Sequence, residues 1–240
     1  MSDMVVGLEG YSGERLEVDP LYRAARVAMR PLDYTKDGVL LGHYAVAQAS
    51  GNITATLGAA AHCAGIRWSD TVRLMVLMRL RVGWGIVTAV TTAVPMSVRA
   101  IIARGFSVDF SSNNTQIDMA TVTNTQKMRA SMGTSLLGTK GPNIMTTAAM
   151  SGQTLTADAA PFAAANWEAL HSTTATGTAV ALQAGSGGEM KTIYECTANA
   201  QHPIVLTSNE GVLMQSLDAG PGSGTFKYYV QWEWAEVVLF

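Results

Sequence analysis

The chain has 240 residues, of which 48% are hydrophobic and only 14% are charged, and its formal net charge at pH 7 is −2. An ordinary soluble domain has roughly 25% charged residues, so the surface is unusually neutral. The small negative charge provides no basic field that would hold nucleic acid. A chain of this length buries a core without help from metals or disulfides.

Two features of the sequence, its cysteine content and its first ten residues, bear on the cellular compartment of the protein. Cys63 and Cys196 are the only cysteines, which supports neither a disulfide framework nor a four-ligand zinc site, so we expect two free thiols. Residues 1–10 lack a basic stretch followed by an apolar run, and we therefore expect no secretory signal. The apolar stretch 72–94 is interrupted by arginines, which argues against a membrane span.

Residues 1–38 concentrate the charge of the chain, and Pro20 and Pro31 prevent a long helix. We interpret this segment as an extended N-terminal arm, with a short strand or helix near 21–29. Its apolar side chains need a surface to cover, and its arginines suit acidic partners. We expect it to reach another subunit, the alternative being a disordered terminus. The proposed interface residues of the arm are Leu16, Leu21, Tyr22, Arg23, Arg26, Val27 and Arg30.

From residue 39 the hydrophobic pattern has a period of two, which is typical of strands with one buried face. The clearest case is 72–86, where apolar residues occupy the even positions. In 98–110, Arg104-Gly105 predicts a bulge, and Asn209-Glu210-Gly211 predicts a turn. The predicted strands are 39–48, 72–86, 98–110, 190–196, 203–207, 212–217 and 225–239.

Two of these strands provide the expected core, with Val76, Leu80, Trp232 and Trp234 buried. The odd positions of 72–86 carry a row of arginines on the opposite side of the strand. The row is either a solvated strand face or a surface that pairs with acidic groups of a neighbouring subunit. Its members are Arg73, Arg79 and Arg81.

Residues 111–189 are rich in Thr, Ala, Ser, Gly, Asn and Met and show little periodicity. Such a long connection is uncommon inside a compact domain. We interpret it as an elaborated insertion that makes contacts outside the domain, with short strands at 117–123 and 179–183 and a short helix at 162–170. The predicted fold is all-β: an antiparallel β-sandwich over 39–240, as a jelly roll, with the N-terminal arm and this long inserted loop region.

The sequence offers no catalytic constellation. The four histidines stand far apart, and no metal-binding spacing connects them. The segment 184–188 resembles a nucleophile elbow only loosely and precedes a strand instead of a helix. We therefore expect no enzymatic activity, no catalytic or metal-binding residues and no cofactor.

Four segments suggest a family: 228–237 (YYVQWEWAEV), 42–47 (GHYAVA), 102–107 (IARGFS) and 203–212 (PIVLTSNEGV). With these segments, residues 39–240 resemble virion structural proteins of tailed bacteriophages, in particular the small β-sandwich proteins that decorate or cement the head. The resemblance implies a homo-oligomer, often a trimer, which is made in the host cytoplasm. It would sit on the outer capsid surface and clamp copies of the major capsid protein, without nucleic acid or membrane as a partner.

Two alternatives remain open at this point. Tail, baseplate and fibre-anchoring components use similar β-sandwiches. A carbohydrate-binding module that recognises a host surface belongs to a different class. Exposed aromatic residues and acidic clusters would favour that module, and the sequence shows no acidic cluster.

Overall fold

The computed structural model describes residues 40–54, 57–88, 90, 94–121, 123–124, 127, 132–170, 172–173, 181–182, 190–196 and 202–238. All of them belong to one compact unit. Within these ranges the secondary structure consists of strands, turns and loops, without a helix. The predicted all-β class is confirmed.

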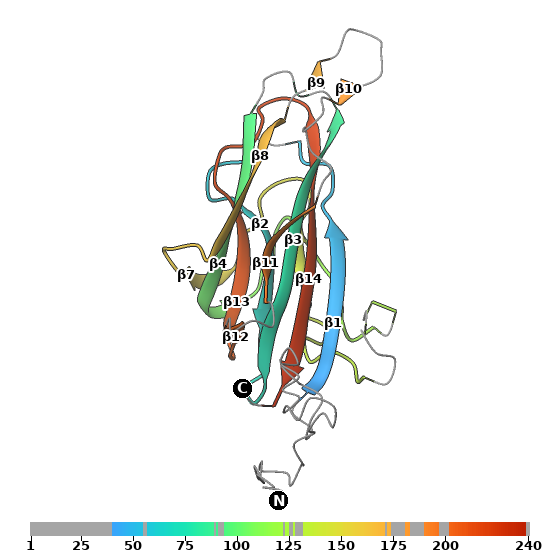
Figure 1. Ribbon diagram of the computed structural model, residues 1–240, viewed down its shortest axis with the longest axis vertical. Coiled ribbons are helices and arrows are strands. Elements are labelled where there is room, and N and C mark those ends of the chain that lie inside the picture. Colours follow the sequence, from blue (N-terminus) through green and yellow to red (C-terminus); the bar gives the residue numbers. More distant parts are fainter. Residues whose placement is uncertain are drawn as a thin grey trace, which may run out of the picture. The chain divides into compact units, whose positions relative to one another are not determined.

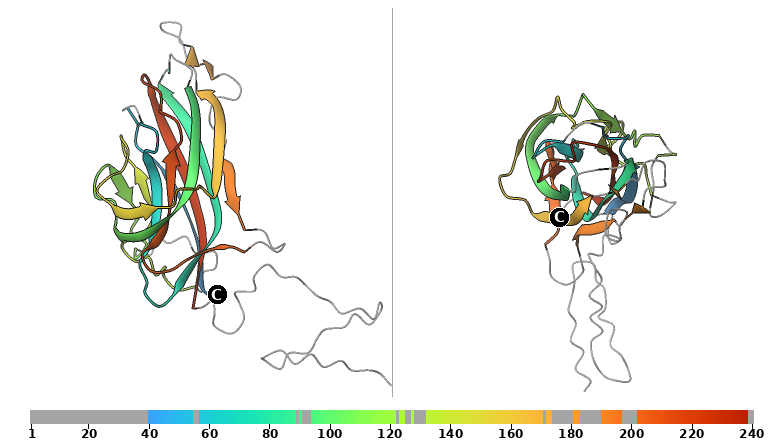
Figure 2. Two further views of the ribbon diagram at one scale, coloured as in Figure 1. Left: turned by 90° about the vertical axis from the view of Figure 1, so that its left-hand side faces the viewer. Right: turned by 90° about the horizontal axis from the view of Figure 1, so that it is seen from above.

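Strands of this unit form two antiparallel sheets that pack face to face around the core (Figures 1 and 2). We call the sheet β1-β14-β3-β11, in which β12 also pairs with β3, the first sheet. The second sheet has the order β5-β6-β2-β13-β4-β7, and β8 also pairs with β4. The strands are β1 Leu40–Ala49, β2 His62–Trp68, β3 Leu74–Thr88, β4 Val94–Val108, β5 Asn114–Gln116, β6 Asn143–Met145, β7 Thr154–Ala157, β8 Ala163–Leu170, β9 Ser172–Thr173, β10 Ala181–Leu182, β11 Lys191–Glu195, β12 Ile204–Leu206, β13 Glu210–Ser216 and β14 Thr225–Val237.

The strand order is that of a jelly roll. Eight strands make up its frame, and the chain alternates between the sheets from β1 to β4. The next strand of the frame, β8, lies in the same sheet as β4. The chain then alternates again between the sheets through β11, β13 and β14. The resulting orders, β1-β14-β3-β11 and β2-β13-β4-β8, are two interleaved four-stranded sheets.

The long pair β3 and β14 forms the centre of the first sheet. Trp84, Trp232 and Trp234 are fully buried in the core, and the ring of Trp84 lies 4.7 Å from that of Tyr228. Alternate residues of β14 are buried from Thr225 to Trp232, because one face of this strand meets the second sheet.

The expected unbroken alternation along 72–86 is wrong. The pairing of β3 with β14 passes from Arg79↔Glu233 to Leu77↔Trp234, so a bulge at Met78 reverses the side-chain direction of the preceding residues. Met75 and Leu77 therefore enter the main core. Val76 is buried as expected, but it belongs to a separate cluster with Ala235 and Val237.

In β4, the predicted irregularity at Arg104-Gly105 is present. The pairing with β7 shifts register after Arg104, and Gly105 has a φ of 55°. That left-handed conformation is accessible to glycine without a steric cost. The predicted turn before β13 is also present, with Asn209 at a φ of 62°.

The region 111–189 differs from expectation. The predicted helix at 162–170 is replaced by strand β8, Ala163–Leu170, which pairs with β4 from Val94 to Ala100. The strand near 117–123 is displaced to β5, while 179–183 contains the short β10. Described side chains of this region also pack into the sandwich core; they are Met119, Leu137, Ile144, Met145, Met150 and Trp167.

Candidate functional site

The outward face of the first sheet carries a row of charged side chains across four strands. Glu233 of β14 is paired in register with Arg79 of β3, and Arg79 is paired with Glu195 of β11. His43 of β1 completes the row on the other side of Glu233. We call His43, Glu233, Arg79 and Glu195 the charge row.

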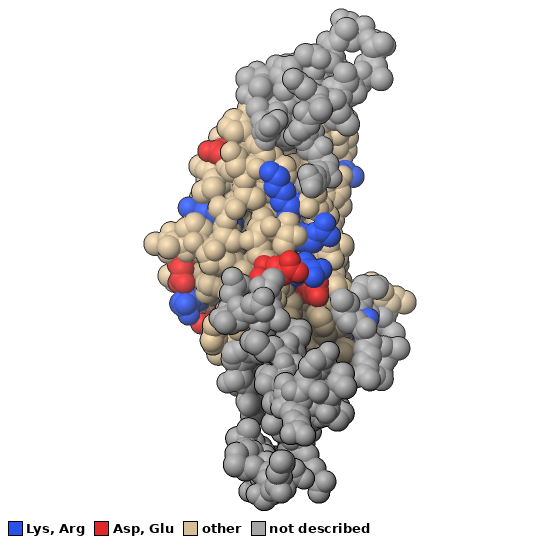
Figure 3. All heavy atoms as spheres, in the orientation of Figure 1, with Lys and Arg blue, Asp and Glu red and all other residues tan. Residues whose placement is uncertain are grey.

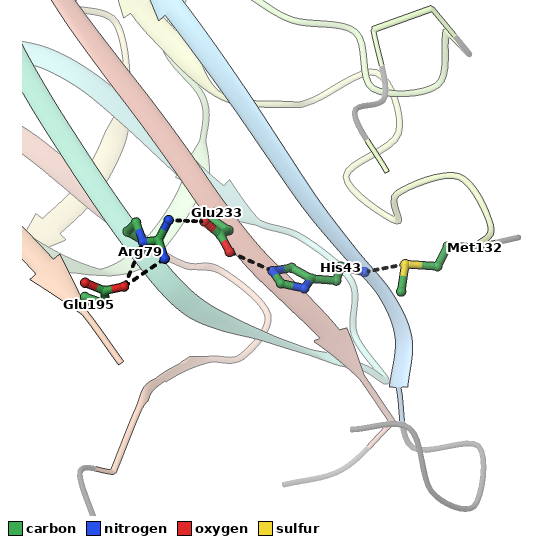
Figure 4. Close-up of polar contacts among 5 residues, drawn as sticks. All are labelled: His43, Arg79, Met132, Glu195 and Glu233. Carbon is green, nitrogen blue, oxygen red and sulfur yellow. Dashed lines mark hydrogen bonds and ion pairs between the residues drawn. The ribbon is translucent and has the colours of Figure 1, made fainter. Parts of the chain in front are cut away.

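The four side chains contact one another in sequence (Figure 4). Nε2 of His43 lies 3.1 Å from Oε1 of Glu233, and the other carboxylate oxygen of Glu233 lies 3.4 Å from Nη1 of Arg79. Nη2 of Arg79 is 2.8 Å from Oε1 of Glu195. The backbone N–H of His43 donates to the sulfur of Met132, so a loop meets the row at its β1 end.

Burial differs along the charge row. The Glu233 side chain is only 10% exposed and is shared between two partners, whereas those of Arg79 and Glu195 are about two-fifths exposed. Exposed ion pairs of this kind contribute at most about 1 kcal/mol each. The row therefore fixes the arrangement of the four strands and presents both signs of charge to a partner, while adding little to stability.

Arg81 lies next to the charge row on β3. Its Nη1 donates to Oε1 of Gln231 over 3.3 Å, and its Nε is buried without a hydrogen-bond partner among the described residues.

The predicted row of three arginines is corrected by the structure, which brings Arg79 and Arg81 together but not Arg73. Arg73 precedes β3 and pairs with Asp70 over 3.9 Å in a turn. Its backbone carbonyl accepts a hydrogen bond from the indole of Trp68. The bulge at Met78 breaks the two-residue period, so Arg73 does not continue the side that Arg79 occupies.

The surface around these charges is largely uncharged (Figure 3). The exposed large apolar side chains of the described residues are Val72, Val87, Val108, Leu217 and Val238. The proposed interface residues of the arm, from Leu16 to Arg30, lie outside the described residues.

The buried carboxylate of Glu236 and the half-buried carboxylate of Asp109 do not belong to the charge row. Glu236 accepts hydrogen bonds from Oγ of Ser135 at 2.5 Å, the backbone N–H of Leu136 at 2.9 Å and the indole of Trp234 at 3.1 Å. Burial raises its pKa, and the three donors oppose that shift. Burial likewise raises the pKa of Asp109, which accepts hydrogen bonds from Gln116 and Asn143. These donors tie loops to strands.

Both cysteines are free thiols, with Cys63 buried and Cys196 half-buried. Burial raises the pKa of the Cys63 thiol to about 12, so it remains protonated and unreactive at neutral pH. Over the part of the chain that the structure describes, no three His, Cys, Asp or Glu side chains gather as metal ligands. The same part contains no helix long and apolar enough to cross a membrane.

Sequence reasoning missed His43, Glu195 and Glu233. The odd parity of Glu233 on β14 indicates an outward side chain, which was a usable signal. The cross-strand register that brings these residues to Arg79 was not available, because it follows from the pairing of segments more than 100 residues apart.

Comparison with models of known families finds no match to this chain, and no curated protein matches it either.

Proposed function

We propose that the chain is a non-enzymatic structural protein of a tailed-bacteriophage virion, a decoration or cement protein on the outside of the capsid. In this role it assembles with itself as a trimer and contacts the major capsid protein. The support is the resemblance of residues 39–240 to such proteins, together with the low content of charged residues, 14% of the chain. Interface cores are depleted in charge in the same way.

The observation that carries this proposal is the outward face of the first sheet. The charge row crosses four strands there, and Arg81 lies beside it on β3. A broad sheet face with few, fixed charges suits the docking of a second protein surface, because rigid charges set the register of contact.

The first test is the binding of purified protein to capsid shells assembled from the major capsid protein of the same virus. Arg81→Glu should weaken binding at least about tenfold, since it replaces an attraction for a carboxylate with a repulsion. The matched control is Arg104→Glu. Arg104 lies on β4 in the second sheet, where it pairs with Asp158 and Glu210. Equal loss in both variants, or loss in neither, contradicts the proposed docking face.

The second test places the protein in intact particles. Labelled protein imaged on virions should decorate the head in a regular lattice. A label confined to the tail or baseplate overturns the capsid role in favour of a tail component. Binding to host glycans without incorporation into particles favours the carbohydrate-binding alternative.

A further inference from the structure

Strand β1 forms one edge of the first sheet, and one side of it is paired throughout. Nine of its residues pair with β14 in register, from Leu40↔Val237 to Ala49↔Tyr229. On the other side, the described residues provide a single isolated bridge, between Tyr44 and Lys127. Edge strands with open backbone groups are templates for the addition of another strand.

The direction of the backbone groups follows from one hydrogen bond. The N–H of Ser50 donates to the carbonyl of Tyr228 over 2.8 Å. In an antiparallel pair, backbone groups alternate between facing the partner strand and facing away. Gln48 therefore points its N–H and C=O at β14, while Ala47 and Ala49 point theirs away from the sheet.

The two ends of this edge are protected to different degrees. Near His43 and Tyr44, the sulfur of Met132 and the carbonyl of Gly133 accept hydrogen bonds from the edge strand. Near Ala47 and Ala49, both alanines are exposed. Proteins guard open edges with Lys, Pro or bulges, and the segment 45–49 (AVAQA) has none of these.

The side chain of Gln48 anchors this half of the edge to the chain itself. It is only 8% exposed, and its Nε2 donates to the carbonyl of Pro142 over 3.0 Å. Its Oε1 is buried as well. The groups that remain open to another strand are therefore the backbone N–H and C=O of Ala47 and Ala49.

We propose that this half of the β1 edge pairs with the same segment of a second copy of the chain, antiparallel about a two-fold axis at Gln48. In that register Ala47 of one copy exchanges both backbone hydrogen bonds with Ala49 of the other. The two Gln48 residues stand opposite each other as a non-hydrogen-bonded pair.

The segment is self-complementary in charge and size. It has no ionisable residue from Ala45 to Ala49, so a two-fold axis brings no like charges together. The exposed side chains are methyl groups, which let two strands approach without a clash. The contact joins two five-stranded sheets into one continuous sheet. It is isologous, so it is distinct from the contacts of the proposed trimer, and it does not depend on the virion role.

The experiment is sedimentation of the full chain over a range of concentrations with Ala47→Pro and Ala47→Ser. Proline at 47 removes an outward N–H and leaves the hydrogen bonds to β14 in place, since proline is tolerated on edges. Dissociation of the two-fold contact should become at least about tenfold easier in Ala47→Pro, because one donor is lost in each copy. Ala47→Ser keeps the N–H and should associate like the unchanged chain.

Amide hydrogen exchange of the unchanged chain provides the second measurement. The Ala47 and Ala49 amides should exchange fast in dilute protein and slow down as it is concentrated, whereas the Gln48 amide should be protected throughout. This readout decides the matter even where Ala47→Pro unfolds in circular dichroism. Equal association of the proline and serine variants when both fold, or fast exchange at Ala47 and Ala49 at high concentration, overturns the proposal.

Discussion

The two sheets of the sandwich differ in how their strands are buried. In the second sheet, every residue of β13 after Glu210 is buried, so both faces of this strand are covered. In the first sheet, β14 alternates between half-buried and buried residues from Thr225 to Trp232. The difference lies in the connecting segments: Phe110, just before the region 111–189, packs beside Gly65 and Leu213 on the second sheet.

The second sheet is therefore covered on both faces at β13 by the chain itself, while the first sheet retains an outward face on which the charge row lies. Whether a strand face is exposed depends on the segments that pack on it. The strand's own sequence indicates a covered outer face only when polar and apolar residues no longer alternate. The segment 210–216 (EGVLMQS) shows this loss of alternation.

The largest expected contrast is between neighbours on β14. Trp232→Ala should destabilise the fold by about 3–5 kcal/mol, since Trp232 is fully buried in the core. Gln231→Ala removes an outward side chain that accepts a hydrogen bond from Arg81, and should cost less than about 1 kcal/mol. Urea unfolding of both variants measures the contrast, and similar losses would show that the outward face is covered after all.

On β13, substitutions of two neighbouring residues should destabilise the fold to a similar extent. Leu213→Ala and Met214→Ala remove fully buried side chains from opposite faces of the strand, and each should cost about 2–5 kcal/mol. The same unfolding measurement applies. A near-neutral result for either variant would mean that the corresponding face of the second sheet is not sealed.

A smaller effect is expected at Glu236, which ties the loop at Ser135 and Leu136 to β14. Glu236→Gln replaces one of the two carboxylate oxygens, which accept hydrogen bonds, with an amide NH2 group, which donates them. Three donors already point at this side chain. One hydrogen bond becomes a repulsive contact, at a cost of about 1–3 kcal/mol. Ser135→Ala is the control, since it removes one donor and leaves no clash. If Glu236→Gln is no worse than Ser135→Ala, the hydrogen-bond arrangement around Glu236 is incorrect.

The smallest effect concerns pH. The pKa values of Asp109 and Glu236 are raised in the folded state, so the native protein binds more protons than the unfolded chain in this range. Their contribution to stability is complete below the unfolded pKa values and is lost as pH rises through the folded ones. The stability of the unchanged protein relative to Asp109→Asn should thus be greater near pH 5 than near pH 7. Urea titrations at both pH values test the sign, and the opposite slope would be inconsistent with the burial of Asp109.

The sequence predicted those elements whose one buried face leaves a two-residue period. The strands near 39–48, 190–196, 203–207 and 225–239 were found within a few residues of their predicted bounds. Strand β2 was missed, because His62–Trp68 is buried on both faces and has no alternation to detect. Strand β8 was mistaken for a helix, since small residues between Ala163 and Trp167 carry little periodic signal.

The candidate site was less predictable than the fold. Arg79 and Arg81 could be placed on an outward face from local spacing alone. Their partners Glu195, Glu233 and Gln231 come from strands distant in sequence, and only the pairing of whole strands decides which of them meet. Sequence periodicity gives side-chain direction but not cross-strand register.

The bulge at Met78 has a consequence for how mutations act on β3. The residues before it, 74–78 (LMVLM), are apolar on both sides of the strand, with Met75 and Leu77 in the main core and Val76 in the separate cluster. Hydrophobicity thus contains no information about which set faces inward. A one-residue slip that removes the bulge but keeps Met78 would exchange the two sets while still burying an apolar residue at every inward position, whereas deletion of Met78 would leave both sets facing as they do. In most strands a one-residue slip turns the buried side chains to solvent. Here it would exchange two faces that are both apolar.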